Sequence, residues 1–226
     1  DGVSATTLMY VTKNEHVQRL ILSDSDGFNE QVILKSNQSI ISPTWSSDAR
    51  DIAYVSFEND RAQVFLHNLA TGKRESILAT GSTVSSPAWS PDKSKIAFSS
   101  TMDGNSEVYL LDLRSKRINR LTDNKAIDTE PAWSPDGKKI LFTSDRSGSP
   151  QIYEINPINL VKRRITTVGN YNARPSYINK QKIIFVHRDT ESFQIASLDL
   201  RTRELDILTS TKNDESPCIA PNGNVI

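Results

Sequence analysis

Apolar residues in this chain gather in short runs separated by polar turns. Continuous runs at 51–56, 95–100, 139–144 and 182–186 are rich in β-branched and aromatic residues, which is typical of buried strands. Segments at 64–69, 108–113, 152–155 and 195–200 alternate apolar with polar residues, which indicates strands with one covered face. No stretch of a dozen residues combines helical periodicity with start and stop signals. The pattern therefore predicts an all-β fold.

A phrase of the form Ser-Pro-x-Trp-Ser-x-Asp precedes the buried runs at a fixed step. Its prolines Pro43, Pro87 and Pro131 are 44 residues apart, and weaker copies surround Pro175 and Pro217. Each unit closes on a charged turn and a fourth apolar run. Four strands in roughly 40–45 residues are typical of one blade of a β-propeller.

We expect residues 1–226 to form a single domain, a six-bladed β-propeller of four-stranded blades that is incomplete at the C-terminal blade. The first blade contains strands at 7–13, 19–24 and 30–34 but lacks an innermost strand. The last blade starts an innermost strand at Pro217 and is truncated, which leaves about five and a half blades. The chain is then a fragment of a ring that would close by lending a C-terminal strand to the first blade. Unpaired strand edges in such a fragment favour aggregation or pairing with another chain.

Charge and composition narrow the possible functions. Lys and Arg total 27 and Asp and Glu total 27, and no basic stretch is interleaved with aromatic residues, so no nucleic-acid partner is expected. No apolar run approaches the 18 residues of a transmembrane segment. Cys218 is the single cysteine, which excludes an intrachain disulfide or a cysteine-based metal site.

The sequence contains few candidates for catalytic or metal-binding residues. Gly-x-Ser-x-Gly does not occur, and His16, His67 and His187 occupy unrelated positions in different blades, so we expect no catalytic residues and no enzyme activity. Residues 24–27 (DSDG) begin like a calcium-binding loop but lack its 12-residue spacing, and a hairpin turn explains them better. We therefore expect no metal and no cofactor. Trp45, Trp89 and Trp133 are interpreted as rings that pack each blade onto its neighbour.

The position of a residue within its blade says more about function than its side-chain chemistry does. Residues just before each innermost strand should lie at one mouth of the central tunnel, here called the start mouth, and the loop between the second and third strands returns to it. Mixed charges at a concave opening suit recognition of a protein or peptide, although any one of them can be an ordinary solvated side chain. The candidate partner-binding residues are Ser85, Ser86, Asp128, Thr129, Glu130, Asp145, Arg146, Ala173, Arg174, Asp214 and Glu215.

The same residues carry a family resemblance over essentially the whole chain. Residues 129–137 (TEPAWSPDG), 141–153 (LFTSDRSGSPQIY), 214–217 (DESP) and 220–223 (APNG), in this order, resemble the C-terminal propeller of the TolB family. Residues 24–29 and 53–58 in the early blades are also similar to it.

The resemblance implies a periplasmic component of the Tol-Pal system, which supports outer-membrane integrity and cell division. In that family the propeller mouth binds the lipoprotein Pal, and some colicin peptides insert into the same tunnel. An N-terminal domain that engages TolA in the family is not in this sequence. The Pal-binding Thr-Glu pair of the family matches Thr129-Glu130. Thr83 stands where the family has a rim histidine, and Ser86 replaces a small alanine, so contacts at that blade are expected to differ.

A second interpretation comes from a different functional class. Similar Ser-Pro-Asp-Gly blades occur in the propellers of prolyl-oligopeptidase-like and tricorn-like peptidases, where the ring filters substrate for a separate catalytic domain. A Gly-x-Ser-x-Gly domain encoded downstream would favour that interpretation. A scaffold for an unknown peptide is a third possibility.

Overall fold

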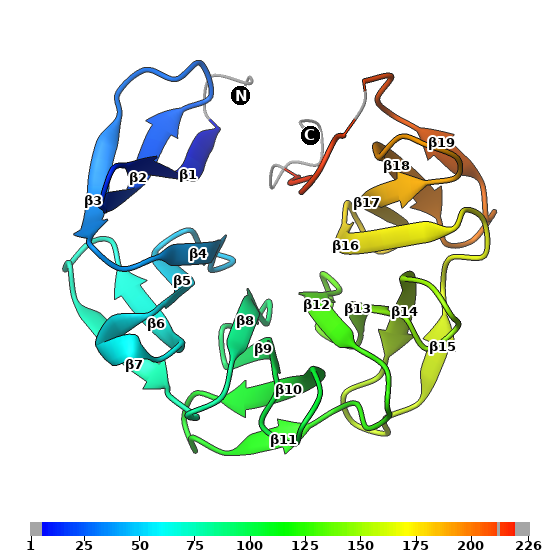
Figure 1. The fold of residues 1–226 in the computed structure, drawn as a ribbon, viewed down its shortest axis with the longest axis horizontal. Coiled ribbons are helices and arrows are strands. Elements are labelled where there is room, and N and C mark those ends of the chain that lie inside the picture. Colours follow the sequence, from blue (N-terminus) through cyan, green and yellow to red (C-terminus); the bar gives the residue numbers. More distant parts are fainter. Residues whose placement is uncertain (1–5, 212, 220–226) are drawn as a thin grey trace.

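The computed structural model describes residues 6–211 and 213–219, and within them five antiparallel sheets surround a common axis (Figure 1). The first sheet has three strands, β1 (Thr7–Asn14), β2 (Val17–Asp24) and β3 (Gln31–Ser36). The other four sheets have four strands each, paired in chain order. A short 3-10 turn, η2 (Glu58–Asp60), follows β5. The prediction of an all-β propeller is confirmed.

The four-stranded sheets repeat one plan. They are, in order, β4 (Ile40–Trp45), β5 (Asp51–Ser56), β6 (Gln63–Asn68) and β7 (Arg74–Leu78); β8 (Val84–Trp89), β9 (Lys95–Ser100), β10 (Glu107–Asp112) and β11 (Ile118–Arg120); β12 (Asp128–Trp133), β13 (Ile140–Ser144), β14 (Gln151–Ile155) and β15 (Lys162–Arg164); and β16 (Tyr171–Tyr177), β17 (Lys182–Arg188), β18 (Gln194–Asp199) and β19 (Leu205–Ile207). The strands β4, β8, β12 and β16 lie nearest the axis (Figure 1).

The described residues include only part of the segment predicted to begin the sixth blade. The sequence predicted an innermost strand beginning at Pro217, but residues 213–219 carry no strand. The remainder of that prediction, at 220–226, lies outside the described residues. The completed ring of six blades therefore stays a prediction.

Apolar side chains from consecutive sheets meet in shared clusters. Val55 and Val64 of the second sheet pack with Phe98 and Tyr109 of the third, and each of these side chains is almost fully buried. Equivalent clusters join the first sheet to the second, the third to the fourth and the fourth to the fifth. Burial of each such side chain contributes about 1.5–3 kcal/mol, so the interfaces between sheets hold the ring together.

The tryptophan of the repeated phrase ends each of three innermost strands. The Trp133 indole donates a hydrogen bond to the Ala88 carbonyl of the preceding sheet, over 3.2 Å, and its ring packs on the cluster between the third and fourth sheets. Trp45 packs on the corresponding cluster between the first and second sheets. The prediction that these rings join neighbouring blades is confirmed for Trp45 and Trp133.

The Ser-x-Asp end of the phrase builds the turn that follows the tryptophan. In the third sheet the Ser90 hydroxyl donates to Asp92 over 2.6 Å and accepts from the Lys95 amide over 2.9 Å. This bond from Ser90 lowers the pKa of Asp92 to about 2. Residues 46–51 and 134–139 repeat these contacts. The phrase therefore recurs because each turn needs a short acceptor and donor at these two positions.

A β-bulge lies inside the innermost strand at the proline of the phrase. Pairing between β12 and β13 shifts between Thr129 and Ala132, and the equivalent shift occurs in β4, β8 and β16. Proline has no amide hydrogen to donate to the ladder, which confines it to such irregular positions. One expectation is corrected here: the innermost strand begins about three residues before the proline, so residues such as Thr129 and Glu130 lie within the strand.

Candidate functional site

The structure brings the candidate residues to one end of the ring. Those at 85–86, 128–130 and 173–174 belong to the first halves of β8, β12 and β16. The loop between β13 and β14 returns to the same end, since Asp145 accepts a hydrogen bond from the Ile127 amide over 2.8 Å. Asp214 is held beside the β17–β18 loop, because its amide donates to the Phe193 carbonyl over 3.0 Å. The expected geometry of the start mouth is therefore present.

A single backbone position places side chains at this mouth. Ser42, Ser86, Glu130, Arg174 and Ser216 each precede the proline of the phrase, and each has a φ between 49° and 58°. A positive φ is uncommon for residues other than glycine, and it recurs here in every copy of the phrase, at the bulge in the four copies that form strands. The position carries serine in three copies, glutamate in one and arginine in one. At this position, charge is therefore confined to the neighbouring fourth and fifth sheets.

The charged members of this set are joined across two sheets. The Arg174 guanidinium lies 3.3 Å from Oε1 of Glu130, and the Arg174 amide donates to Oε2 of Glu130 over 2.9 Å. The hydroxyl of Thr143, on β13, also donates to Oε2 over 2.8 Å. The Glu130 side chain is 25% exposed, so its carboxylate is held firmly yet still reaches solvent.

Hydroxyl groups on the second strands connect neighbouring bulges. The Glu130 amide donates to the Ser99 hydroxyl of the preceding sheet over 3.2 Å, and the Arg174 amide donates to the Thr143 hydroxyl over 3.2 Å. Ser99 and Thr143 hold the same place in their blades. Sequence reasoning missed both, although their alignment within the repeat could have identified them.

Arg174 also contacts the segment that follows the fifth sheet. Its Nη1 lies 3.6 Å from a carboxylate oxygen of Glu215 and donates a hydrogen bond to the Ser216 hydroxyl. The side chains of Arg174 and Glu215 are 45% and 63% exposed. One guanidinium therefore serves two carboxylates, and the cluster Glu130–Arg174–Glu215 carries a net negative charge.

Two other candidates form a buried pair beneath the mouth. Asp128 is fully buried, and its Oδ2 accepts hydrogen bonds from Arg146 over 2.5 Å and from Asn124 over 2.8 Å. The Arg146 guanidinium also lies over the rings of Phe142 and Tyr153. Asp128 acts structurally here, since it fixes the β13–β14 loop against the start of β12. A direct contact of Asp128 or Arg146 with a partner stays a prediction.

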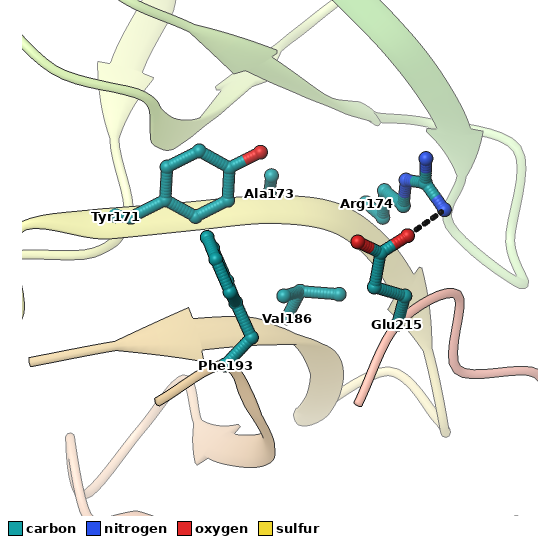
Figure 2. A pocket seen from close by; sticks show the side chains of 6 residues that line it. All are labelled: Tyr171, Ala173, Arg174, Val186, Phe193 and Glu215. Atoms are coloured by element: carbon teal, nitrogen blue, oxygen red, sulfur yellow. Dashed lines mark ion pairs between the residues drawn. The ribbon is translucent and has the colours of Figure 1, made fainter. Parts of the chain in front are cut away.

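A small pocket opens beside the charged cluster (Figure 2). Its volume is about 60 Å³, and it is lined by Tyr171, Ala173, Arg174, Val186, Phe193 and Glu215. Burial, and then the negative charge of Glu130, raise the pKa of Tyr171. Of the lining residues, Tyr171, Val186 and Phe193 were not identified from the sequence, because each reads as an ordinary strand or loop residue.

A larger hollow lies at the opposite end of the innermost strands, the turn mouth. Its volume is about 480 Å³, and its lining is uncharged and dominated by the repeated tryptophans and prolines: Thr44, Trp45, Ser47, Pro87, Ala88, Trp89, Pro91, Pro131, Ala132, Trp133, Pro135, Ser176 and Tyr177. All three tryptophans line this hollow, and Trp45 and Trp133 also pack between neighbouring blades.

Within the part of the chain that the structure describes, no cluster of three or more metal-binding side chains occurs. A search of the same residues finds no helix with the length and apolar character needed to cross a membrane.

Comparison with known proteins gives one family match over the whole chain. The family described as the TolB beta propeller domain matches residues 1–226. A Tol-Pal system protein TolB from Alcanivorax borkumensis is 49% identical over 78 residues, which cover 33% of this chain and 18% of that protein. The crystal structure of TolB from Acinetobacter baumannii is 39% identical, with a TM-score of 0.93 over 98% of this chain. This chain spans 57% of that solved chain.

More distant propellers share the fold alone. A puromycin-hydrolyzing peptidase from Mycobacterium tuberculosis has a TM-score of 0.68, with 13% identity, over 84% of this chain and 32% of the peptidase. At that identity the likeness says nothing of shared activity.

Proposed function

The chain belongs to the TolB β-propeller domain family, and from this we propose that it is a non-enzymatic, periplasmic interaction domain of the Tol-Pal system that binds the lipoprotein Pal at the start mouth. In this role it supports outer-membrane integrity and cell division. Colicin-type peptides are proposed as ligands of the same mouth. Contact with TolA would require a domain outside this sequence, and a ring of six blades is proposed for the complete propeller.

One observation supports the start mouth as the binding site. The Thr129-Glu130 pair, which matches the Pal-binding pair of the family, lies at the start mouth with the Glu130 carboxylate held by Thr143 and Arg174. A carboxylate fixed before the partner arrives loses little conformational entropy on binding. The surrounding cluster keeps an exposed second carboxylate on Glu215.

The proposed mechanism is electrostatic and steric complementarity at a rigid opening. Glu130 accepts hydrogen bonds from the partner or pairs with a partner cation, and Arg174 exchanges one of its two carboxylates for one on the partner. A charge pair buried in this way can contribute several kcal/mol or nothing, according to how well its hydrogen bonds are satisfied. The mouth is therefore expected to determine specificity and association rate as much as affinity.

The test is a calorimetric titration of the full-length protein with the periplasmic domain of Pal from the same organism. Saturable binding at one Pal per propeller supports the proposal. A folded protein that shows no heat of binding, at concentrations well above those of a typical specific complex, contradicts it. Peptide hydrolysis by the full-length protein would instead favour the peptidase interpretation.

A further inference from the structure

The pocket in Figure 2 has one apolar side and one charged side. The rings of Tyr171 and Phe193 stand at one end, the ion pair of Arg174 and Glu215 stands at the other, and Ala173 and Val186 lie between them. Its 60 Å³ exceeds the about 10–15 Å³ that one water molecule requires on the same measure. The space suits a short branched aliphatic side chain.

The aromatic end of the pocket is rigid. The Tyr171 and Phe193 rings meet edge to face with centroids 5.1 Å apart. The Arg188 guanidinium lies over both rings, 4.7 Å from the Phe193 centroid and 5.5 Å from the Tyr171 centroid. Such edge-to-face and cation–π contacts fix the orientation of both rings. The pocket is therefore preformed, as expected for the pockets that receive anchoring side chains in protein interfaces.

Comparison with the neighbouring blades explains why the pocket is apolar. Val186 holds the place that Ser99 occupies in the third sheet and Thr143 in the fourth. In those sheets the hydroxyl accepts a hydrogen bond from the next bulge, at Glu130 and at Arg174. Val186 has no hydroxyl to offer, so the seam beside Glu215 has an apolar floor at this point.

The charges beside the pocket indicate what should accompany the aliphatic side chain. Glu130 and Glu215 provide two carboxylates against the single guanidinium of Arg174. Glu215 is the more exposed member of its pair with Arg174. It can therefore exchange Arg174 for a partner cation with little loss of free energy. Complementarity therefore favours a positive residue next to the aliphatic one.

We propose that this pocket binds a Val-sized aliphatic side chain of the partner, and that a Lys or Arg adjacent to it in the partner sequence pairs with Glu215. This rests on the proposed function, because it specifies the kind of contact made at the start mouth. It does not require that the partner be Pal.

The test uses blocked dipeptides and the full-length protein with labelled valine methyl groups. We expect Ac-Lys-Val-NH₂ to shift the Val186 methyl signals and to bind about tenfold or more tightly than Ac-Lys-Gly-NH₂, because the Gly peptide buries no side chain. Ac-Glu-Val-NH₂ should bind more weakly than Ac-Lys-Val-NH₂. Equal shifts with the Val and Gly peptides, or none with either, would overturn the proposal.

Two variants keep the experiment interpretable. Val186→Thr preserves size and places in the fifth sheet the residue that the fourth sheet already carries, so it should fold and should weaken the Val peptide severalfold. Glu215→Gln should remove the preference for Lys over Glu while retaining the preference for Val over Gly. Unchanged preferences in both variants contradict the proposal. Failure of Pal to bind, with dipeptide binding intact, contradicts only the proposed function.

Discussion

The backbone amide of Arg174 donates a hydrogen bond to Oε2 of Glu130, over 2.9 Å, across the seam between the fourth and fifth sheets. Both side chains reach solvent, and exposed ion pairs contribute about 0–1 kcal/mol to stability. We therefore expect Glu130→Gln, which keeps an acceptor for this amide, to lower the free energy of unfolding by less than about 1 kcal/mol. Denaturant titration of parent and variant measures the difference. A much larger loss would show that Glu130 serves mainly to hold the blades together.

The buried pair of Asp128 and Arg146 should behave differently. Asp128→Ala removes the carboxylate from a guanidinium that is 23% exposed, and breaking a buried pair costs about 3–5 kcal/mol. We expect a loss near the lower end of that range, because Arg146 retains partial contact with water. Asp128→Asn, which keeps an oxygen for Arg146, should lose clearly less in the same denaturant titration. Because both variants remove the charge, equal losses would contradict a contribution from the retained oxygen.

Gly169 lies where a side chain has no room. Its φ is +82°, and a Cβ there would overlap Cε1 of His187 and lie 3.0 Å from the Arg188 carbonyl. Gly148 also has a positive φ, of +96°, but open space surrounds its Cβ position. Gly148→Ala should therefore lose about 1–2 kcal/mol from backbone strain alone. Gly169→Ala should lose about 1–3 kcal/mol more through overpacking.

Both substitutions place an alanine in the left-handed region. The difference in stability between the two variants therefore measures the cost of the steric overlap at Gly169. Thermal or denaturant unfolding of the two variants gives the comparison directly. Similar stability in both would mean that His187 moves aside without cost.

Sequence periodicity predicted the propeller well, because each repeat contains the residues that its turns and its contacts with the neighbouring sheet require. Turns need Ser90 and Asp92, and neighbouring sheets need Trp133, so each blade repeats the same residues. The convergence of Glu130 and Arg174 also followed from their equivalent positions in consecutive blades.

Other features depend on contacts that a single sequence does not display. The bulge that directs Glu130 is set by a positive φ, the burial of Asp128 is set by its neighbours Asn124 and Arg146, and the pocket arises where Val186 replaces a hydroxyl residue. The strand expected at Pro217 did not form in residues 213–219, since repeat position alone does not supply a pairing partner.

Acid should destabilise the fold through two buried histidines. Burial lowers the pKa of His187, and burial followed by the charge of Arg74 lowers the pKa of His67. Between these lowered values and the unfolded pKa of about 6.5, the unfolded chain binds more protons. Stability is therefore complete above about pH 6.5 and falls as the pH drops towards the folded values.

Denaturant midpoints measured from about pH 7.5 to about pH 5.5 test this dependence. The double variant His67→Gln, His187→Gln should show a flatter profile than the parent, whatever its absolute stability. Identical slopes in the two proteins, or a parent that gains stability on acidification through this range, would contradict the assignment.

The claim that the start mouth binds Pal is tested most directly by calorimetric titration of Pal into full-length variants of this mouth. Glu130→Ala and Thr129→Ala are compared with Glu75→Ala, which alters an exposed glutamate on the outermost strand β7. We expect the first two to weaken binding by about 1 kcal/mol or more, the level that marks an interface hot spot, and the third to match the parent. Unchanged affinity in both mouth variants, with Pal still bound by the parent, would place the Pal site elsewhere on the propeller.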